Sequence, residues 1–551
     1  MPRLVLGPAL RYLDETEATV WVETDVACEV SILGRAARTF EVRGHHYALV
    51  QLDGLAPGTT SAYEVALDGE PQTDWIPEGF PAPVIRTPSP DEPARIAFGS
   101  CRVAVPHEPP YSLRKDQDPR GREIDALHVL ALRMREQPHE RWPTRLMMLG
   151  DQVYADEVSP RTREFIRARR PVDEPPGEDI ADFEEYTRLY LESWGEPVLR
   201  WLMATVATAM VFDDHDVVDD WNISQSWVAD MQECPWWEDR ITGAFMSYWV
   251  YQHIGNLEPA TLREDAMWAK VSAAAGDVGE LLRRFGSRAD DEVDGTRWSY
   301  ARDYGGVRIV VIDSRAGRVL DPGERSMVDA DEWRWICERL VGGHDHLVVA
   351  TTLPVMLGHG MHFVEAWNEA VCDGAWGALA GRAGEKVRRA LDMEHWAAFG
   401  RSFDLLTGRL REVAAGEHGP PPASITILSG DVHHAYLSEV AFRREAGVVT
   451  PVYQAVCSPF RNPLDARERR MIRLATSKLG HVVGRALART AGVRDPDLRW
   501  RMVEGPYFDN QVATLELHGR RASLTLERTV ADDADLDHEP ELVHCFTHRL
   551  A

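Results

Sequence analysis

Residues 210–222 read MVFDDHDVVDDWN, a short apolar run that ends in a dense group of carboxylate and imidazole side chains. The apolar run predicts a buried strand, which places Asp213, Asp214 and His215 just beyond its carboxyl end. Neighbouring carboxylates repel one another, and bound cations or solvent must relieve this repulsion. We therefore interpret this stretch as one part of a metal site in an α/β fold.

The same arrangement of an apolar strand followed by polar groups recurs five more times along the chain. The segments are RIAFGSCR at 95–102, LMMLGDQVYADE at 146–157, RIVVIDSR at 308–315, LVVATTLP at 347–354 and ITILSGDVHHAY at 425–436. Open sheets bind their ligands just beyond the carboxyl ends of their strands. We therefore expect polar side chains from distant segments to meet at one edge and form a metal-dependent hydrolytic site.

The chain changes character near residue 90. Residues 1–90 contain short alternating runs such as ATVWVET and SAYEVALDG, which predict an all-β domain, and LDGLAPGTTSAYEV resembles part of a fibronectin type III-like sandwich. Over residues 91–530, strands alternate with helical stretches such as 124–136 and 330–341, which is the pattern of an α/β domain. Residues 531–551 begin ADDADLDHEPE and are expected to form an acidic, solvated tail.

Composition limits the function classes. The net charge of −27 argues against a surface for nucleic-acid backbones, which require clustered Lys and Arg. Bound cations would reverse the acidic field locally, so a phosphate-bearing substrate remains compatible with it. Seven cysteines without a CxxC pair argue against a disulfide framework. The sequence shows no membrane-spanning run and no secretory or twin-arginine signal, so we expect a cytoplasmic protein.

Several of the strand-end residues are good metal ligands. Asp151 is expected at a strand tip, where its carboxylate can bridge two cations, and Tyr154 lies three residues further on. Asp431 and His433 are two residues apart, so both fall on one side of an extended segment, and carboxylate and imidazole both bind transition metals. Cys101 is either buried filler or a thiolate ligand. A thiolate beside a tyrosine suits ferric iron better than magnesium or calcium.

Four motifs, GSC, GDxxY, DDHD and GDVH, occur in this order along the chain. Together they resemble the alkaline phosphatase D (PhoD-like) family of the calcineurin-type metallophosphoesterases, over about residues 91–530. The IDSR segment at 312–315 is similar to the family's Asp-x-Arg strand. The resemblance implies a four-layer αββα sandwich after the small β domain, and hydrolysis of phosphate esters.

The resemblance also implies a role for each matched residue. The expected ligands are Cys101, Asp151, Tyr154 and His433 for ferric iron, and Asp151, Asp214 and Asp431 for calcium. Other divalent metals are compatible with the same ligands. His215 matches the histidine that lies beside the scissile ester, and Arg102 and Arg315 are expected to contact phosphate oxygens. The choice between Asp213 and Asp214 stays open; Asp214 is preferred because it directly precedes the histidine.

The expected mechanism follows from two neighbouring ions. They would lower the pKa of a bridging water and orient the resulting hydroxide for attack on phosphorus. His215 would donate a proton to the departing alkoxide. The substrate class is a small-molecule or lipid-type phosphate ester, and the preference for monoesters or diesters stays open. The alternative is a catalytically inactive metal-binding scaffold in which the β-sandwich is the recognition module.

Overall fold

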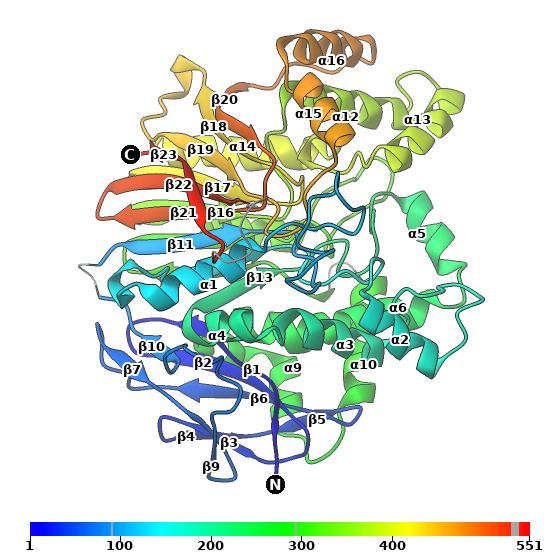
Figure 1. Ribbon diagram of the computed structural model, residues 1–551. Helices are drawn as coiled ribbons and strands as arrows, with labels where there is room; N and C mark the ends of the chain where they lie inside the picture. Colours follow the sequence, from blue (N-terminus) through cyan, green and yellow to red (C-terminus); the bar gives the residue numbers. More distant parts are fainter. Residues whose placement is uncertain (90–91, 293–294, 531–538) are drawn as a thin grey trace.

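The protein folds into two stacked β-sheets with helices outside both, preceded by an N-terminal β region (Figure 1). The N-terminal strands lie at the bottom of the view, and α15 (Ala466–Ala475) and α16 (Lys478–Thr490) lie at the top. The computed structural model describes residues 1–89, 92–292, 295–530 and 539–551. No helix within these ranges is long and apolar enough to cross a membrane.

The N-terminal region is all-β, as expected from its alternating runs. The first of its sheets has the order β1 (Leu4–Leu13), β2 (Ala18–Thr24), β6 (His45–Leu52), β5 (Phe40–Val42), the second has the order β4 (Arg35–Arg38), β3 (Glu29–Ile32), β8 (Val65–Leu67), β9 (Glu70–Gln72), and β10 (Val84–Arg86) pairs with β7 (Thr60–Ala62). Apolar side chains such as Val20, Val30 and Val65 fill the space between the two larger sheets.

The N-terminal region is packed tightly onto the rest of the molecule. Every residue of β2 is buried, because Trp21 on its other face packs against Tyr251, with ring centroids 5.2 Å apart. The fully buried Arg11 donates hydrogen bonds to the carbonyl oxygens of Thr208 at 3.0 Å and Gln252 at 2.9 Å. The first sheet is therefore covered on both faces.

The two large sheets supply the strands whose ends the sequence analysis singled out. The first has the order β13 (Ala207–Val211), β12 (Arg145–Leu149), β11 (Ala94–Gly99), β21 (Gln511–His518), β22 (Arg521–Thr529), β23 (Leu542–Arg549), and the second has the order β14 (Tyr300–Tyr304), β15 (Val307–Val311), β16 (His346–Ala350), β17 (Ser424–Ser429), β19 (Val452–Val456), β18 (Ala435–Phe442), β20 (Leu498–Tyr507). Strands β11, β12 and β13 are parallel, and so are β15, β16, β17 and β19. Such strands are buried on both faces, which explains their continuous apolar runs.

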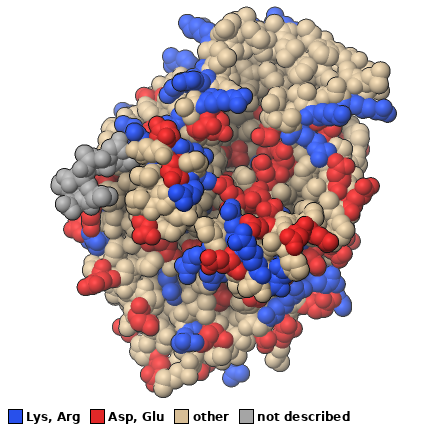
Figure 2. Space-filling view, turned by 45° about the vertical axis from the view of Figure 1, so that its right-hand side comes forward, with Lys and Arg blue, Asp and Glu red and all other residues tan. Residues whose placement is uncertain are grey.

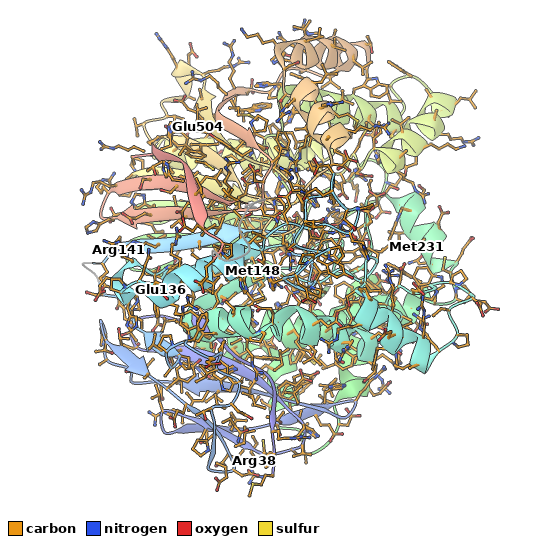
Figure 3. All side chains as sticks on the ribbon, viewed as in Figure 1. Arg38, Glu136, Arg141, Met148, Met231 and Glu504 are labelled. Carbon is orange, nitrogen blue, oxygen red and sulfur yellow. The ribbon has the colours of Figure 1, made fainter. Side chains whose placement is uncertain are left out.

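Alternate residues of each strand enter different cores. On β12, Met147 faces the core between the sheets, whereas Met148, labelled in Figure 3, joins the core under the helices. On β16, Val348 faces the core between the sheets and Val349 the core on the outer side of the second sheet. The expected αββα sandwich is therefore confirmed.

The helices occupy two stretches of the chain. Between β11 and β14 they are α1 (Ala126–Glu136), α2 (Pro160–Arg169), α3 (Phe183–Trp194), α4 (Pro197–Thr205), α5 (Gln225–Gln232), α6 (Trp237–Ser247), the π-helix Tyr248–His253, α7 (Ile254–Asn256), α8 (Pro259–Glu264), α9 (Ala266–Ser272) and α10 (Gly279–Asp291). After β15 they are α11 (Ala330–Arg339), α12 (His359–Cys372), α13 (Ala378–Ala390), α14 (Gly400–Ala414), α15 and α16.

The C-terminal end differs from the expectation of an acidic tail over residues 531–551. Residues 542–549 form β23, which pairs with β22 and brings Phe546 opposite Leu526 in the core between the sheets. The tail prediction is therefore wrong for this part, because pairing with β22 and burial of Phe546 outweigh the acidic composition just before it. Residues 531–538 lie outside the described residues.

Candidate metal centre

The carboxyl ends of the parallel strands from both sheets meet at one place. Cys101, Asp151 and His433 each offer a ligand atom within 4.8 Å of the others. Asp151, Asp213, Asp214 and Asp431 form a second group within the same distance. Asp151 belongs to both groups, as a residue that bridges two ions would.

The backbone is strained where it presents these side chains. Cys101, Asp151, Asp431 and His433 have φ angles of 57°, 51°, 65° and 49°, a region that residues other than glycine seldom occupy. Strained residues of this kind persist where the surrounding structure holds them, and they gather at functional sites. The neighbouring Gly150 is required by space as well, because a Cβ there would lie 2.3 Å from Asp213 Oδ2.

The first group contains sulfur, oxygen and nitrogen donors. Tyr154 donates a hydrogen bond from Oη to Asp151 Oδ2 at 3.4 Å, while the buried Asp151 Oδ1 has no hydrogen-bond partner. Burial lowers the pKa of His433 to about 4, so its imidazole is neutral and has a free lone pair. Burial also raises the pKa of the Cys101 thiol, which a bound cation would reverse. This donor set fits a transition-metal ion such as ferric iron.

The second group is built around a buried arginine. Arg315, which is fully buried, donates from Nε to Asp213 Oδ1 at 2.5 Å. Its Nη2 lies 3.1 Å from Asp214 Oδ1 and 3.5 Å from Asp431 Oδ1, and its Nη1 contacts Glu394. The guanidinium therefore lies among several carboxylates, although Nη2 is buried without a hydrogen-bond partner. The expected contact between Arg315 and a phosphate oxygen stays a prediction.

If all the carboxylates of this group were ionised, they would carry more negative charge than Arg315 can balance. Burial raises the pKa of Asp213 and Asp214 well above the usual range, and Arg315 opposes this only in part. Burial raises the pKa of Asp151 to about 6 as well. Asp213 Oδ2 and Asp214 Oδ1 are both buried without a hydrogen-bond partner. An oxygen-rich group with surplus negative charge fits a hard cation such as calcium.

His215 lies at the edge of the centre. Its Nδ1 is 3.0 Å from both carboxylate oxygens of Asp156, and its ring packs on Tyr154 with centroids 4.6 Å apart. Burial alone would lower the pKa of His215, but the Asp156 carboxylate and its neighbours raise it well above the usual value. Asp156 therefore fixes a proton on Nδ1 and leaves Nε2 as the atom that can exchange a proton.

Arg102 does not join the centre. Its Nε donates to Asp125 at 2.7 Å and its Nη1 donates to the carbonyl oxygen of Ser193 at 3.0 Å. Asp125 in turn caps the first turn of α1 by accepting from Leu127 N. The buried Arg102 thus anchors a helix, and the phosphate contact expected of it is not supported.

Some residues of the centre were not found from the sequence. His395 Nδ1 donates to Glu365 Oε1 at 2.8 Å, and His395 Nε2 lies 3.5 Å from Asp431 Oδ2. Asn462 donates to Tyr154 Oη at 3.3 Å. Both lie in loops rather than directly after an apolar strand, so the strand-end pattern could not find them. Asp156 did stand in a quoted motif, within GDQVYADE, and only its role was missed.

Comparisons with known proteins agree with this geometry. Residues 133–482 match the family described as PhoD-like phosphatase. The chain belongs to that family. Residues 1–86 match a domain of unknown function, DUF7800.

A solved structure titled "Structure of PhoD" is similar to this chain, with a TM-score of 0.60 and 12% sequence identity. The match covers 99% of this chain and 90% of that chain, and at this identity it shows the fold alone. The comparison with curated proteins gave no match. As a PhoD-like phosphatase, the protein is a phosphoesterase with candidate metal-binding clusters.

Proposed function

We propose that this PhoD-like protein hydrolyses small-molecule or lipid-type phosphate esters at the centre described above. The proposal rests on one observation above others, the place of Asp151 in both ligand groups. Ferric iron would be held by Cys101, Asp151, Tyr154 and His433, and calcium by Asp151, Asp214 and Asp431. When bound, such ions supply Lewis acidity and a water of lowered pKa between them.

Asp214 is preferred over Asp213 as a ligand. Asp213 Oδ1 already accepts hydrogen bonds from Arg315 and from Thr352 Oγ1 at 3.1 Å. Asp214 Oδ1 faces Arg315 alone, at a longer distance of 3.1 Å. Arg315 would then share the carboxylates with the second ion and keep them from repelling one another.

His215 is the proposed proton donor to the leaving alkoxide. Its partner Asp156 holds the Nδ1 proton, so the proton that leaves is the one on Nε2. Side-chain exposure of 23% leaves the ring accessible from the edge of the centre. A donor with a raised pKa is charged at neutral pH, which also favours the negative charge that develops on the leaving oxygen.

The proposal is tested with Asp151→Asn, using Asp230→Asn as the matched control, because Asp230 is an exposed residue on α5 whose contact is Arg389. Turnover of mono- and bis-nitrophenyl phosphate and the bound metal per chain are measured for both variants. Asp151→Asn should lose turnover and metal together, while the control keeps both. Near-normal turnover by Asp151→Asn would show that the bridging role is wrong, and the ratio of the two substrates defines the ester preference.

The alternative of an inactive scaffold has less support. A decayed centre would have lost ligands, whereas each expected ligand position here holds a metal-binding side chain. The first sheet of the β-sandwich is also covered by the α/β domain, which leaves less of it for recognition. Metal-loaded protein without turnover on any phosphate ester would favour the scaffold instead.

A further inference from the structure

The two helices at the top of the molecule in Figure 1, α15 and α16, carry several exposed apolar side chains. We call residues 466–490, which comprise α15 and α16, the α15–α16 cap. Five of its large apolar side chains have exposures between 56 and 64%: Met471 and Leu474 on α15, and Leu479, Val482 and Val483 on α16. Monomeric proteins seldom expose such a patch unless it binds something.

The orientation of α16 explains why these side chains point outward. Gly480 and Gly484 lie on the face of α16 that contacts α12, where a Cβ at Gly484 would meet the carbonyl oxygen of Gly360 at 2.7 Å. Close approach to α12 therefore uses the small residues. Leu479, Val482 and Val483 follow the i, i+3, i+4 spacing of one helix face, and that face is exposed. A surface helix of a globular protein normally buries its apolar face, and α16 does the reverse.

The cap also carries positive charge in an acidic protein. Residues 466–490 contain seven Arg or Lys and one Glu, a net charge of +6 (7 − 1), whereas the whole chain carries −27. Arg485 and Arg489 pair with Asp495, but Arg470 and Lys478 have no ion pair among the described residues. Figure 2 shows the upper end of the molecule as a broad surface of other residues bordered by Lys and Arg.

From these observations we propose that the α15–α16 cap binds the surface of an anionic lipid bilayer. Helices that lie on membranes combine exposed apolar side chains with Lys and Arg at the edges of the apolar face. Each basic residue near an anionic surface contributes about 1 kcal/mol. A second copy of the chain is the less suitable occupant, because two caps of charge +6 repel each other. The acidic remainder of the chain repels the bilayer, so the cap sets the orientation of binding.

The cap is joined directly to the candidate metal centre. The segment between β19 and α15 contains Ser458, which donates to Cys101 Sγ at 3.2 Å, and Asn462, which donates to Tyr154. On α15, the Arg473 guanidinium lies 5.0 Å from the ring of Phe508. Docking of the cap would therefore hold the centre near lipid headgroups. This consequence, unlike the docking itself, rests on the proposed function and favours membrane lipids with phosphodiester headgroups as substrates.

The test measures binding of the full-length protein to vesicles of phosphatidylcholine alone and with phosphatidylglycerol added, by flotation. Wild type should bind the anionic vesicles, and more weakly as salt is raised. The double variant Val482→Glu/Val483→Glu should lose about tenfold or more in affinity. The matched control Val26→Glu/Val449→Glu changes two exposed valines outside the cap and should bind as wild type does.

Three outcomes would overturn the proposal. They are no binding of wild type to anionic vesicles, equal loss in both double variants, and a concentration-dependent dimer in sedimentation that Val482→Glu/Val483→Glu abolishes. The substituted valines are exposed, so the thermal unfolding of the variant should match wild type. Turnover of soluble bis-nitrophenyl phosphate by the variant should also match wild type. If wild type itself shows no turnover, that result counts against the proposed function and leaves the vesicle result unaffected.

Discussion

Replacing Arg315 by Met separates the charge of this residue from the charge that a metal ion supplies. Arg315 is fully buried and lies within 3.5 Å of the carboxylates of Asp213, Asp214 and Asp431. Removing one partner of a buried ion pair costs about 3–5 kcal/mol. The same magnitude follows from the carboxylates themselves, because two charges within 4.8 Å repel by about 3 kcal/mol at an effective dielectric constant near 20.

The assay is denaturant unfolding of wild type and Arg315→Met, in EDTA and in calcium. In EDTA the variant should be less stable by about 3–5 kcal/mol. Calcium should stabilise the variant more than wild type, because the ion replaces the missing positive charge; a site filled at a hundred times its Kd contributes about 2.7 kcal/mol.

Arg318→Met is the matched control for this experiment. Arg318 is fully buried beside Arg315 and pairs with Glu394, but its other hydrogen bonds go to carbonyl oxygens and none goes to the aspartates of the centre. Its loss of stability should be the same in EDTA and in calcium. The reasoning is refuted if Arg315→Met loses less than about 1 kcal/mol, or if calcium stabilises it no more than it stabilises wild type.

Three further predictions follow from the contacts of single residues. Asp156→Asn should slow the hydrolysis of esters with poor leaving groups by about ten- to a hundredfold. Hydrolysis of nitrophenyl esters should slow far less, since nitrophenolate leaves without a proton from His215. Equal slowing of both ester types would contradict this role of Asp156. Cys101→Ser should remove iron and the visible charge-transfer band together, and a colour unchanged in the variant would exclude the thiolate ligand. Burial alone would lower the pKa of His45, but hydrogen bonds to Glu184 and Glu23 raise it to about 9. The stabilisation by protonated His45 is therefore fully present below about pH 6.5 and is lost as the pH rises through 9. Denaturant unfolding of His45→Gln at pH 6 and pH 10 should lack this loss of stability.

The strand-end pattern predicted that these candidate ligands lie close together, because topology alone brings them to one place. Cys101, Asp151, Asp214 and Asp431 each follow a parallel strand, and parallel strands that share a direction end at one edge. Charge alone did not reveal the partners of the two arginines, Asp125 for Arg102 and the carboxylates of the centre for Arg315. Whether Arg315 faces a substrate or a ring of carboxylates depends on burial and on partners far away in the chain, which no local pattern records.

The surface features were harder to predict than the centre. The spacing of Leu479, Val482 and Val483 is that of a helix which packs inward, and only the glycine contacts with α12 turn this face outward. At the C-terminus, an acidic stretch directly before β23 concealed a strand whose inward residue is Phe546. In both places, the structure depends on which face of a helix or strand is buried. Residues distant in sequence determine this.

The two-sided burial of β2 has a consequence for how the chain can be divided. Cutting near residue 90 would uncover Trp21's partners, including Tyr251, and leave the carbonyl oxygens of Thr208 and Gln252 without the donor that Arg11 provides. A fragment that begins after the β-sandwich should therefore aggregate instead of folding. The turns at Gly34 and Gly69, which have open space around them, are places where a fluorescent label or an affinity peptide can be inserted without disturbing the α/β domain.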